Sequence, residues 1–259
     1  MKTNFTEIYL LKSALFALSF SAALVCSAHA QANKIPELIL NDVNDAPFTR
    51  ADGSGFLDVV AGEAFRRAGV TLRLVKLPAE RALLNANAGI EDGDLSRIAG
   101  LEAQYPNLIK VPEKLVEWEF TAFSMDRTIR TRLDAIRAHS IAHIKGWKIY
   151  EQMMAGAPAV TTADDSAQLF RLLALKRVEV VLYTRWMGLA KIREQGLRGV
   201  VALEPPLATR EMFIYLHKRH ADLVPKIAAA LRDLKKEGFY ERQFREKVLG
   251  YVSVEPRRK

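Results

Sequence analysis

Short runs of apolar and β-branched residues alternate with amphipathic segments along most of the chain. Residues 37–43 (ELILNDV) are predicted to form a strand. Residues 56–68 place their apolar side chains on one face at helical spacing, and Gly69 is suited to end that helix. Strands that alternate with helices are typical of α/β proteins. The pattern therefore predicts an α/β fold.

The same criteria predict the remaining elements. Further strands are expected at 70–77, 108–111, 115–125, 140–144, 160–162, 178–183, 200–203 and 212–216. Further helices are expected at 78–88, 131–138, 146–154, 164–175, 185–195, 223–236 and 239–248. Residues 90–98 are interpreted as a short polar stretch near a strand end. The chain contains no repeat and no low-complexity tract.

The N-terminus has the pattern of an export signal. Lys2 and Lys12 precede an apolar run over residues 13–28, and the run ends in the small-x-small sequence Ala28-His29-Ala30. Charged, apolar and small-residue regions in that order indicate a secretory signal peptide, and we expect cleavage after Ala30. Two alternatives stay open: a permanent N-terminal anchor, and a lipid anchor at Cys26.

Composition narrows the class of protein further. Of 259 residues, 49% are hydrophobic and 26% are charged, which is ordinary for a globular protein. Cys26 is the one cysteine, so a disulfide framework and a zinc site built on paired cysteines are excluded. Cleavage after Ala30 would remove two lysines and one glutamate, and the formal net charge would change from +8 to +7. In an exported protein without a helix-turn-helix, this charge favours an anionic ligand or membrane surface over nucleic acid.

Seven short motifs, in order, resemble those of one family. They are Ala46-Pro47-Phe48, Gly55-Phe56, the Pro-x-x-Arg-Ala-Leu helix at 78–83, residues 89–93 (GIEDG), Phe123-Ser124, residues 177–181 (RVEVV) and the tail from 216 to 239. The chain resembles the extracellular solute-binding proteins of family 3, the substrate-binding type of polar amino acid ABC transporters.

The resemblance implies a type II periplasmic-binding-protein fold. It implies a first lobe made of 31–123 and 206–259 and a second lobe at 124–205, and the signal peptide at 1–30 agrees with the resemblance independently. Such lobes are joined by two crossovers and close around a ligand by a hinge motion. The expected partners are a small-molecule ligand and an inner-membrane ABC permease or sensor; the expected form is a monomer without cofactor or metal.

Four candidate binding residues lie in the first lobe. Arg97 follows Asp94-Leu95-Ser96 and resembles the family's carboxylate-binding arginines, and Arg81 matches its helix arginine. An arginine fork donates two parallel hydrogen bonds to a carboxylate. Asp45 and Phe48 follow the first strand, where the loop should face the cleft. The simpler interpretations are a turn cap for Asp45, a core residue for Phe48 and surface charges for the two arginines.

The other candidates precede the crossover or lie in the second lobe. Strand-to-helix junctions expose free backbone N–H groups and are suited to anions. The candidates at such positions are Lys145, Trp147, Thr161, Thr162, Tyr183 and Arg185, while Phe123 and Ser124 precede the crossover and could line the cleft or the hinge. Family members that bind α-amino acids commonly carry an Asp near the position of Thr184, and this chain has none there. Together with Arg185, that departure favours a more anionic ligand.

Three functions are compatible with these residues. The leading one is a periplasmic solute-binding protein that captures a small polar, carboxylate-bearing ligand for a transporter or sensor. A dehydratase resembling cyclohexadienyl dehydratase would use the same fold, but it needs a carboxylic acid in the cleft as proton donor. The third is a binding protein without a transport function. The His139-x-x-x-His143 spacing resembles a metal site but lacks a third ligand.

Overall fold

The computed structural model describes residues 35–253. Its central element is a ten-stranded mixed β-sheet. The strands are β1 (Glu37–Asp42), β2 (Thr71–Lys76), β3 (Gly93–Ile98), β4 (Leu108–Lys110), β5 (Val116–Ser124), β6 (Ile141–Ile144), β7 (Val160–Ala163), β8 (Val180–Thr184), β9 (Val201–Ala202) and β10 (Ala208–His217). Their order in the sheet is β2-β1-β3-β10-β5-β8-β6-β7, while β4 pairs with β10 and β9 pairs with β5.

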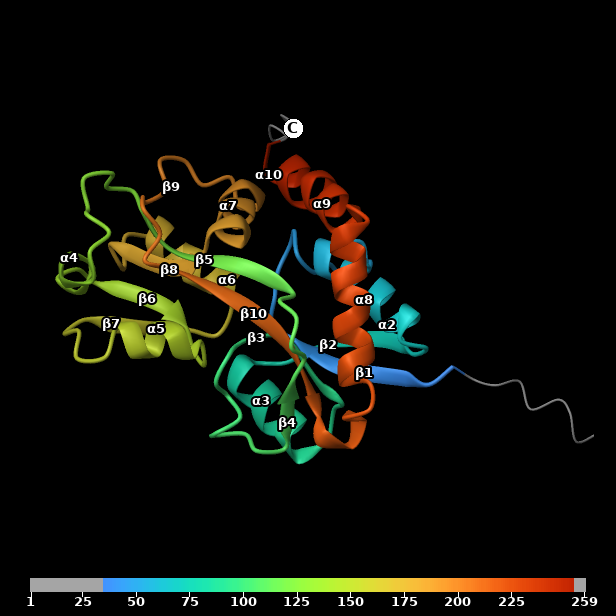
Figure 1. The fold of residues 1–259 in the computed structure, drawn as a ribbon. Coiled ribbons are helices and arrows are strands. Elements are labelled where there is room, and N and C mark those ends of the chain that lie inside the picture. The colour runs from blue at the N-terminus through green and yellow to red at the C-terminus, as the bar shows by residue number, and fades with distance from the viewer. Residues whose placement is uncertain (1–34, 254–259) are drawn as a thin grey trace, which may run out of the picture. The chain divides into compact units, whose positions relative to one another are not determined.

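Helices flank both ends of this sheet. They are α2 (Phe56–Arg67), α3 (Ala79–Ala88), α4 (Leu133–Arg137), α5 (Lys148–Met153), α6 (Ser166–Ala174), α7 (Arg185–Glu194), η1 (Lys218–His220), α8 (Val224–Lys236), α9 (Phe239–Phe244), the π-helical η2 (Arg245–Leu249) and α10 (Gly250–Ser253). Helices α2 and α3 pack beside β1, β2 and β3, whereas α6 and α7 pack beside β6 and β8 (Figure 1). Within residues 35–253, no helix is long and apolar enough to cross a bilayer.

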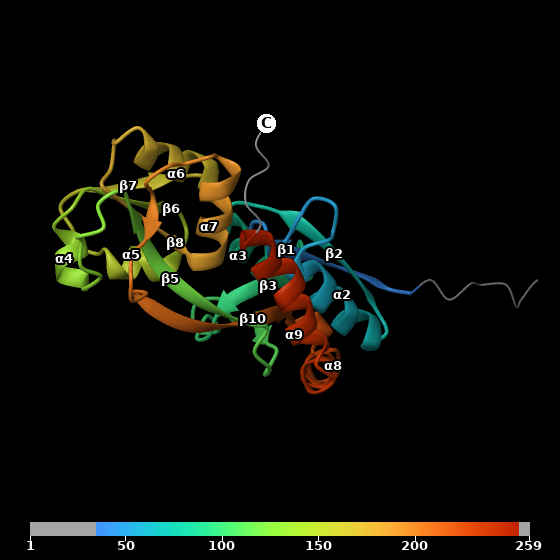
Figure 2. The same cartoon turned by 90° about the horizontal axis from the view of Figure 1, so that it is seen from above.

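Two long antiparallel strands join two parallel groups. β10 pairs with β5 along Ala208–Met212 and then with β3 along Met212–Leu216. β5 pairs with β8 along Phe120–Ser124. We call β2, β1 and β3 half-sheet A and β8, β6 and β7 half-sheet B; the strands within each are parallel. Figures 1 and 2 show β5 and β10 running between the two half-sheets.

The expected elements occur close to the expected positions, with two differences. Residues 90–98, interpreted as a polar stretch, contain the central strand β3, all of whose residues but Ile98 are buried. The interpretation was wrong because the polar residues Asp94 and Arg97 pair with each other inside the fold, 2.7 Å apart. β10 is also longer than predicted, since its exposed start, 208–211, pairs with β5 although its sequence is polar.

Aromatic packing fills the core on both sides of the central strands. Phe48 contacts Phe56 edge to face at 5.9 Å, and Phe123 contacts Phe170 at 5.4 Å. Gly188 of α7 lies directly on the Phe123 ring, where an added Cβ would come within 2.2 Å of a ring carbon. The absence of a side chain at Gly188 thus lets α7 pack closely against β5.

Asp92 fastens the beginning of β3 to the neighbouring elements. Its carboxylate accepts hydrogen bonds from Ile39 N at 2.7 Å and Arg219 Nη2 at 2.6 Å, and it contacts His220 Nε2 at 2.5 Å. Burial acts to raise the pKa of Asp92, but these donors outweigh it and bring the pKa below its ordinary value. The ionised carboxylate therefore stabilises the fold.

We predict that Asp92→Asn lowers the free energy of unfolding by about 2 kcal/mol at pH 7, because hydrogen bonds to a charged group are lost. A carboxyl with a lowered folded pKa stabilises the protein above its unfolded pKa, and this stabilisation disappears as pH falls through the folded pKa. Urea unfolding should therefore show the difference between wild type and variant shrinking below about pH 4. Asp134→Asn, on the surface, is the control; a difference that is unchanged at pH 3 would contradict the assignment.

Candidate functional site

The carboxyl ends of strands from both half-sheets meet around one cavity. This cavity, which we call cavity 2, has a volume of about 280 Å³. Residues at or just after the ends of β1, β2, β6, β7 and β8 line it, namely Asp42, Val43, Asn44, Asp45, Lys76, Leu77, Ile144, Asp164, Asp165, Ser166 and Tyr183, together with Pro78, Ala79 and Trp147. Ligands in open α/β sheets bind outside the carboxyl ends of strands.

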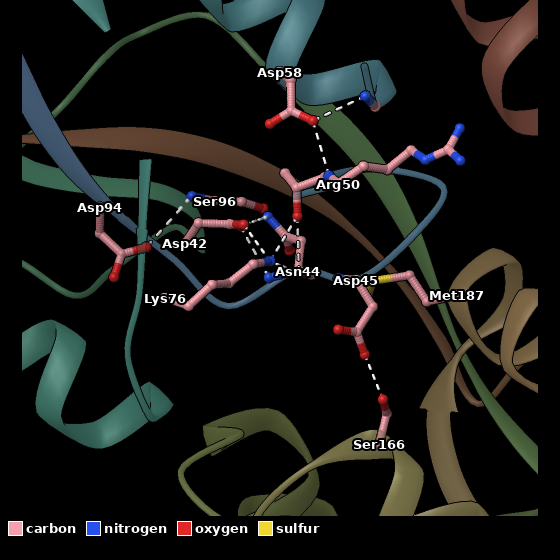
Figure 3. Close-up of polar contacts among 12 residues, drawn as sticks. Asp42, Asn44, Asp45, Arg50, Asp58, Lys76, Asp94, Ser96, Ser166 and Met187 are labelled. Carbon is pink, nitrogen blue, oxygen red and sulfur yellow. Dashed lines mark hydrogen bonds and ion pairs between the residues drawn. The ribbon is translucent and has the colours of Figure 1, made fainter. Parts of the chain in front are cut away.

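The buried Asp42 and the exposed Lys76, whose side chain is 57% accessible, form an ion pair in the wall of cavity 2 (Figure 3). Lys76 Nζ lies 2.5 Å from Asp42 Oδ2, and Asp42 is 1% exposed. The other carboxylate oxygen accepts from Asn44 N at 2.9 Å and Asn44 Nδ2 at 2.8 Å. Lys76 also donates to Thr49 Oγ1 at 2.8 Å and to the carbonyl oxygen of Asn44. The ammonium group of Lys76 is therefore bound to acceptors of the protein, although its side chain is open to solvent.

Asp45 links the two half-sheets directly. Its Oδ2 accepts from Tyr183 Oη at 2.7 Å and from Ser166 Oγ at 2.5 Å, and both donors belong to half-sheet B or its helix α6. Its backbone N–H also points to Met187 Sδ at 3.1 Å (Figure 3). Burial and the negative charge of Asp45 raise the pKa of Tyr183 well above its ordinary value, so this phenol stays protonated and donates.

Trp147 lies among aromatic neighbours in the walls of cavity 2 and of a second, smaller space. Its ring stacks on Tyr183 with centroids 4.9 Å apart, lies parallel to Tyr150 at 6.0 Å and contacts Trp118 at 6.2 Å. Trp147 lines both spaces. An aromatic wall of this kind can stack on a planar or cationic ligand group.

The smaller space, cavity 1, has a volume of about 50 Å³ and several polar groups without partners. Arg97 donates to Asp94 Oδ2 at 2.7 Å and to the carbonyl of Ala79 at 3.1 Å, but its Nε has no hydrogen-bond partner in residues 35–253. The same holds for Trp118 Nε1 and Ser96 Oγ. Buried donors of this kind need an oxygen acceptor, and the volume suits a small polar group or a few waters.

The third space, cavity 3, adjoins cavity 2. Its volume is about 430 Å³, and it shares Pro78 and Asp164 with cavity 2. Arg81 and Lys145 line it, and both side chains are exposed. Neither forms an ion pair with another described residue. These two cations are thus available to a ligand in cavity 3.

Six of the residues predicted from the sequence line these three cavities. Asp45, Trp147 and Tyr183 line cavity 2, Arg97 lines cavity 1, and Arg81 and Lys145 line cavity 3. The other six lie outside the three cavities, and they are Phe48, Phe123, Ser124, Thr161, Thr162 and Arg185. Their contribution to ligand binding stays a prediction.

The six residues outside the cavities have other contacts. Phe48 and Phe123 are core residues, and Ser124 Oγ donates to the carbonyl of Glu179 at 2.8 Å. Thr161 and Thr162 lie exposed on β7, at the end of the sheet. Arg185 forms ion pairs with Glu204 and, at 3.6 Å, with Glu119. Its charge is therefore already neutralised, which removes the argument for an anionic ligand that rested on it.

Several site residues were not predicted from the sequence. Asp42, Asn44 and Lys76 end or follow predicted strands, and that position could have identified them. Trp118 is an inward residue of the alternating stretch VEWEF and was indistinguishable from core. Ser166 stands one residue after Asp165, which caps α6 by accepting from Gln168 N at 2.7 Å.

No model of a known protein family matches the chain. A sequence relative is an uncharacterized protein of Shewanella oneidensis, 23% identical over 197 residues, which cover 71% of this chain and 73% of the relative. The name of this relative carries no functional information.

Solved structures similar to this one share a single architecture. A mutant of ArgBP from T. maritima aligns with a TM-score of 0.70 at 19% identity, covering 82% of this chain and 94% of that one. A histidine kinase sensor domain with similarity to periplasmic binding proteins gives 0.71 at 19%, covering 84% and 96%. An amino acid ABC transporter substrate-binding protein of Streptococcus pneumoniae, bound to L-arginine, gives a TM-score of 0.70 at 12% identity, covering 84% of this chain and 97% of that one.

The chain has the type II periplasmic-binding-protein fold. The predicted fold class is confirmed.

The buried ion pair of Asp94 and Arg97 allows a prediction about the stability of this fold. Burial raises the pKa of Asp94, against the attraction of Arg97. Arg97→Ala leaves a carboxyl without its partner in the interior, so we expect a loss of about 3–5 kcal/mol in urea unfolding. The double variant Asp94→Asn with Arg97→Gln should recover at least half of that loss. A loss below about 1 kcal/mol in the single variant would show that the pair is not structural.

Proposed function

We propose that the chain is a solute-binding protein of the polar amino acid type, which captures a small polar molecule in the space formed by cavities 2 and 3. The observation that carries the proposal is the convergence of strand ends from both half-sheets on cavity 2. Structures of the same fold support it, since their names describe an arginine-bound transporter component, an ArgBP and a sensor domain.

We further propose that the two half-sheets belong to two lobes that close on the ligand. The lobe limits inferred from the sequence, 31–123 with 206–259 and 124–205, place half-sheet A in the first lobe and half-sheet B in the second. β5 and β10 then provide the two crossovers. Bending of these strands would separate Asp45 from Tyr183 and Ser166 and open cavity 2. Closure of that kind is a hinge motion.

The ligand is proposed to carry a carboxylate that binds in cavity 3. Arg97 was the leading candidate for this role, but its guanidinium is bound to Asp94. Arg81 and Lys145 are exposed beside cavity 3 and form no ion pair with another described residue. They are the cations best placed to bind an incoming carboxylate.

Export and delivery follow from the same proposal. The signal peptide at 1–30 and the alternative anchor at Cys26 lie outside the described residues, so periplasmic location rests on the sequence. The partner is proposed to be an inner-membrane ABC permease or a sensor, and the protein is proposed to act as a monomer.

The proposed mechanism is binding without bond chemistry. The alternative, a dehydratase on this fold, needs a protonated carboxyl in the cleft. Asp94 is the buried carboxyl whose pKa is raised, yet it lines none of the three cavities and is bound by Arg97. The geometry therefore favours a binding protein.

A ligand screen tests the proposal. A ligand at 100 times its Kd stabilises the folded state by about 2.7 kcal/mol, which corresponds to a rise in Tm of about 5–10 °C for a chain of this size. We expect such a rise with one class of amino acids or related small molecules, and the cleft-lining Trp147 should change its fluorescence on binding. Trp147→Phe should lose most of that change.

Trp186→Phe is the matched control, because Trp186 packs against Phe244 and lies outside the three cavities. It should keep the fluorescence response. Turnover of a cyclohexadienyl substrate, or a complete screen without any thermal shift, would contradict the proposed function.

A further inference from the structure

Cations and exposed apolar side chains gather at the end of half-sheet B that is opposite to cavity 2. The strands β6, β7 and β8 begin together there, since Ile141 is paired with both Val160 and Val180. β5 ends at the same place, because Ser124 pairs with Val180 and with Val201 of β9. Cavity 2 lies at the other, carboxyl ends of β6, β7 and β8. This end of half-sheet B is therefore separate from the candidate ligand site.

We call this end of half-sheet B the distal face. It is made of the segments that follow β5 or lead into β6, β7, β8 and β9, namely 125–139, 155–160, 175–179 and 195–200. The helix α4 belongs to the first of these segments. In both views it lies at the end of the molecule that is farthest from half-sheet A (Figures 1 and 2).

The distal face carries a surplus of positive charge. Its four segments contain seven lysines and arginines but only three aspartates and glutamates. Asp134 is already paired with Arg132, and Glu179 with His139, which leaves Asp126 as the carboxylate without an ion pair in these segments. Five cations of the face are exposed and form no ion pair with another described residue: Arg127, Arg130, Lys176, Arg177 and Arg198.

Large apolar side chains are exposed on the same face. Seven such side chains are exposed in the described part of the chain, and four of them lie here: Met125, Leu133, Val160 and Leu175. Leu175, which is 62% exposed, directly precedes two of the free cations, and Met125 precedes another by two residues. Apolar and cationic side chains are therefore interleaved. Exposed apolar side chains that gather in one region indicate a contact surface.

This interleaving favours a lipid surface over a protein partner. The centre of a protein interface is depleted of charged residues, and the distal face has no apolar centre free of them. On an anionic bilayer, by contrast, arginine and lysine place their aliphatic stems along the acyl boundary while their charged ends reach the phosphates. Each cation close to such a surface adds to the attraction.

We propose that the distal face binds reversibly to an anionic phospholipid surface. The five free cations contact the headgroup phosphates, and Met125, Leu133 and Leu175 lie at the acyl boundary. Cavity 2 stays uncovered, because it is at the opposite ends of the strands of half-sheet B. The surplus of positive charge in the sequence thus has a location and a partner that are independent of the ligand site.

Vesicle sedimentation tests the inference on residues 31–259, which lack the apolar leader that would itself bind lipid. Vesicles of phosphatidylethanolamine and phosphatidylglycerol are compared with vesicles of phosphatidylcholine. The partition coefficient for the anionic vesicles should be larger by about tenfold or more in about 50 mM NaCl. It should fall at least about fivefold in about 500 mM NaCl, because salt screens exposed charges. Equal partition into both kinds of vesicle overturns the inference, and an acidic protein is then the partner to seek.

A triple variant tests the cations of the face. Arg127→Gln, Arg130→Gln and Arg177→Gln together should lower the partition into anionic vesicles by about tenfold or more. The matched control removes the same charge from exposed cations of α8 and η2 that form no ion pair with another described residue, as Lys226→Gln, Lys236→Gln and Arg245→Gln. The control should stay within about twofold of the wild type. Equal losses in the two triple variants would show attraction by net charge alone and overturn the inference.

A further variant tests the apolar contact. Leu133→Ser with Leu175→Ser should lower the partition at least about threefold, because apolar area is no longer buried at the acyl boundary. Its salt dependence should stay that of the wild type, since the cations are kept. An unchanged partition in this variant would contradict insertion and with it the lipid surface. None of these measurements needs a ligand, so their outcome is independent of the proposed function.

Discussion

The pairing of β10 with two strands at once is the constraint on which the rest of the structure depends. One half of β10 pairs with β5 and the other with β3, so two separate parallel groups become one hydrogen-bonded sheet. β1 and β8 run in opposite senses in this array, because β5 and β10 reverse the direction between them. Loops that follow strands far apart in the chain thereby meet at cavity 2. The polar groups that half-sheets A and B contribute to cavity 2 face one another because of this pairing.

Internal charge pairing then decides which side chains remain free for a ligand. Lys76 and Arg97 stand at positions suited to an anion, but each is bound to an aspartate at 2.5 and 2.7 Å. Asp42, Asp94 and Arg97 are buried, and buried ions require a partner because the interior solvates them poorly. Once these pairs are formed, the inner site is acidic and the remaining cations, Arg81 and Lys145, line cavity 3. The overall net charge of +8 therefore gives the wrong sign for the inner cavity.

Much of the fold was predictable from local patterns, and less of the site was. Apolar periodicity located most helices and strands, because burying one face is a local property of the sequence. β3 was missed because its polar residues Asp94 and Arg97 form their ion pair only once the protein is folded. At the site, Asp45, Trp147 and Tyr183 were predicted from their places after strands. Whether Arg185 is free or bound to Glu119 and Glu204 depends on contacts between distant segments, which a pattern along the chain does not contain.

Trp147 has a consequence for the range of ligands that the protein accepts. Its indole lines both cavity 1 and cavity 2, as Val43 and Asn44 also do, so a rotation of that one side chain would change the size and shape of both spaces. Ligands of two lengths would then select two rotamers of a single residue. A ligand that fitted only a minor rotamer would have an apparent affinity reduced by the fraction of molecules in that state, about a hundredfold for a population of about 1%. Selectivity by length would thus be a rotamer equilibrium, adjustable by the residues that stack on Trp147 without any change in the groups that bind the ligand.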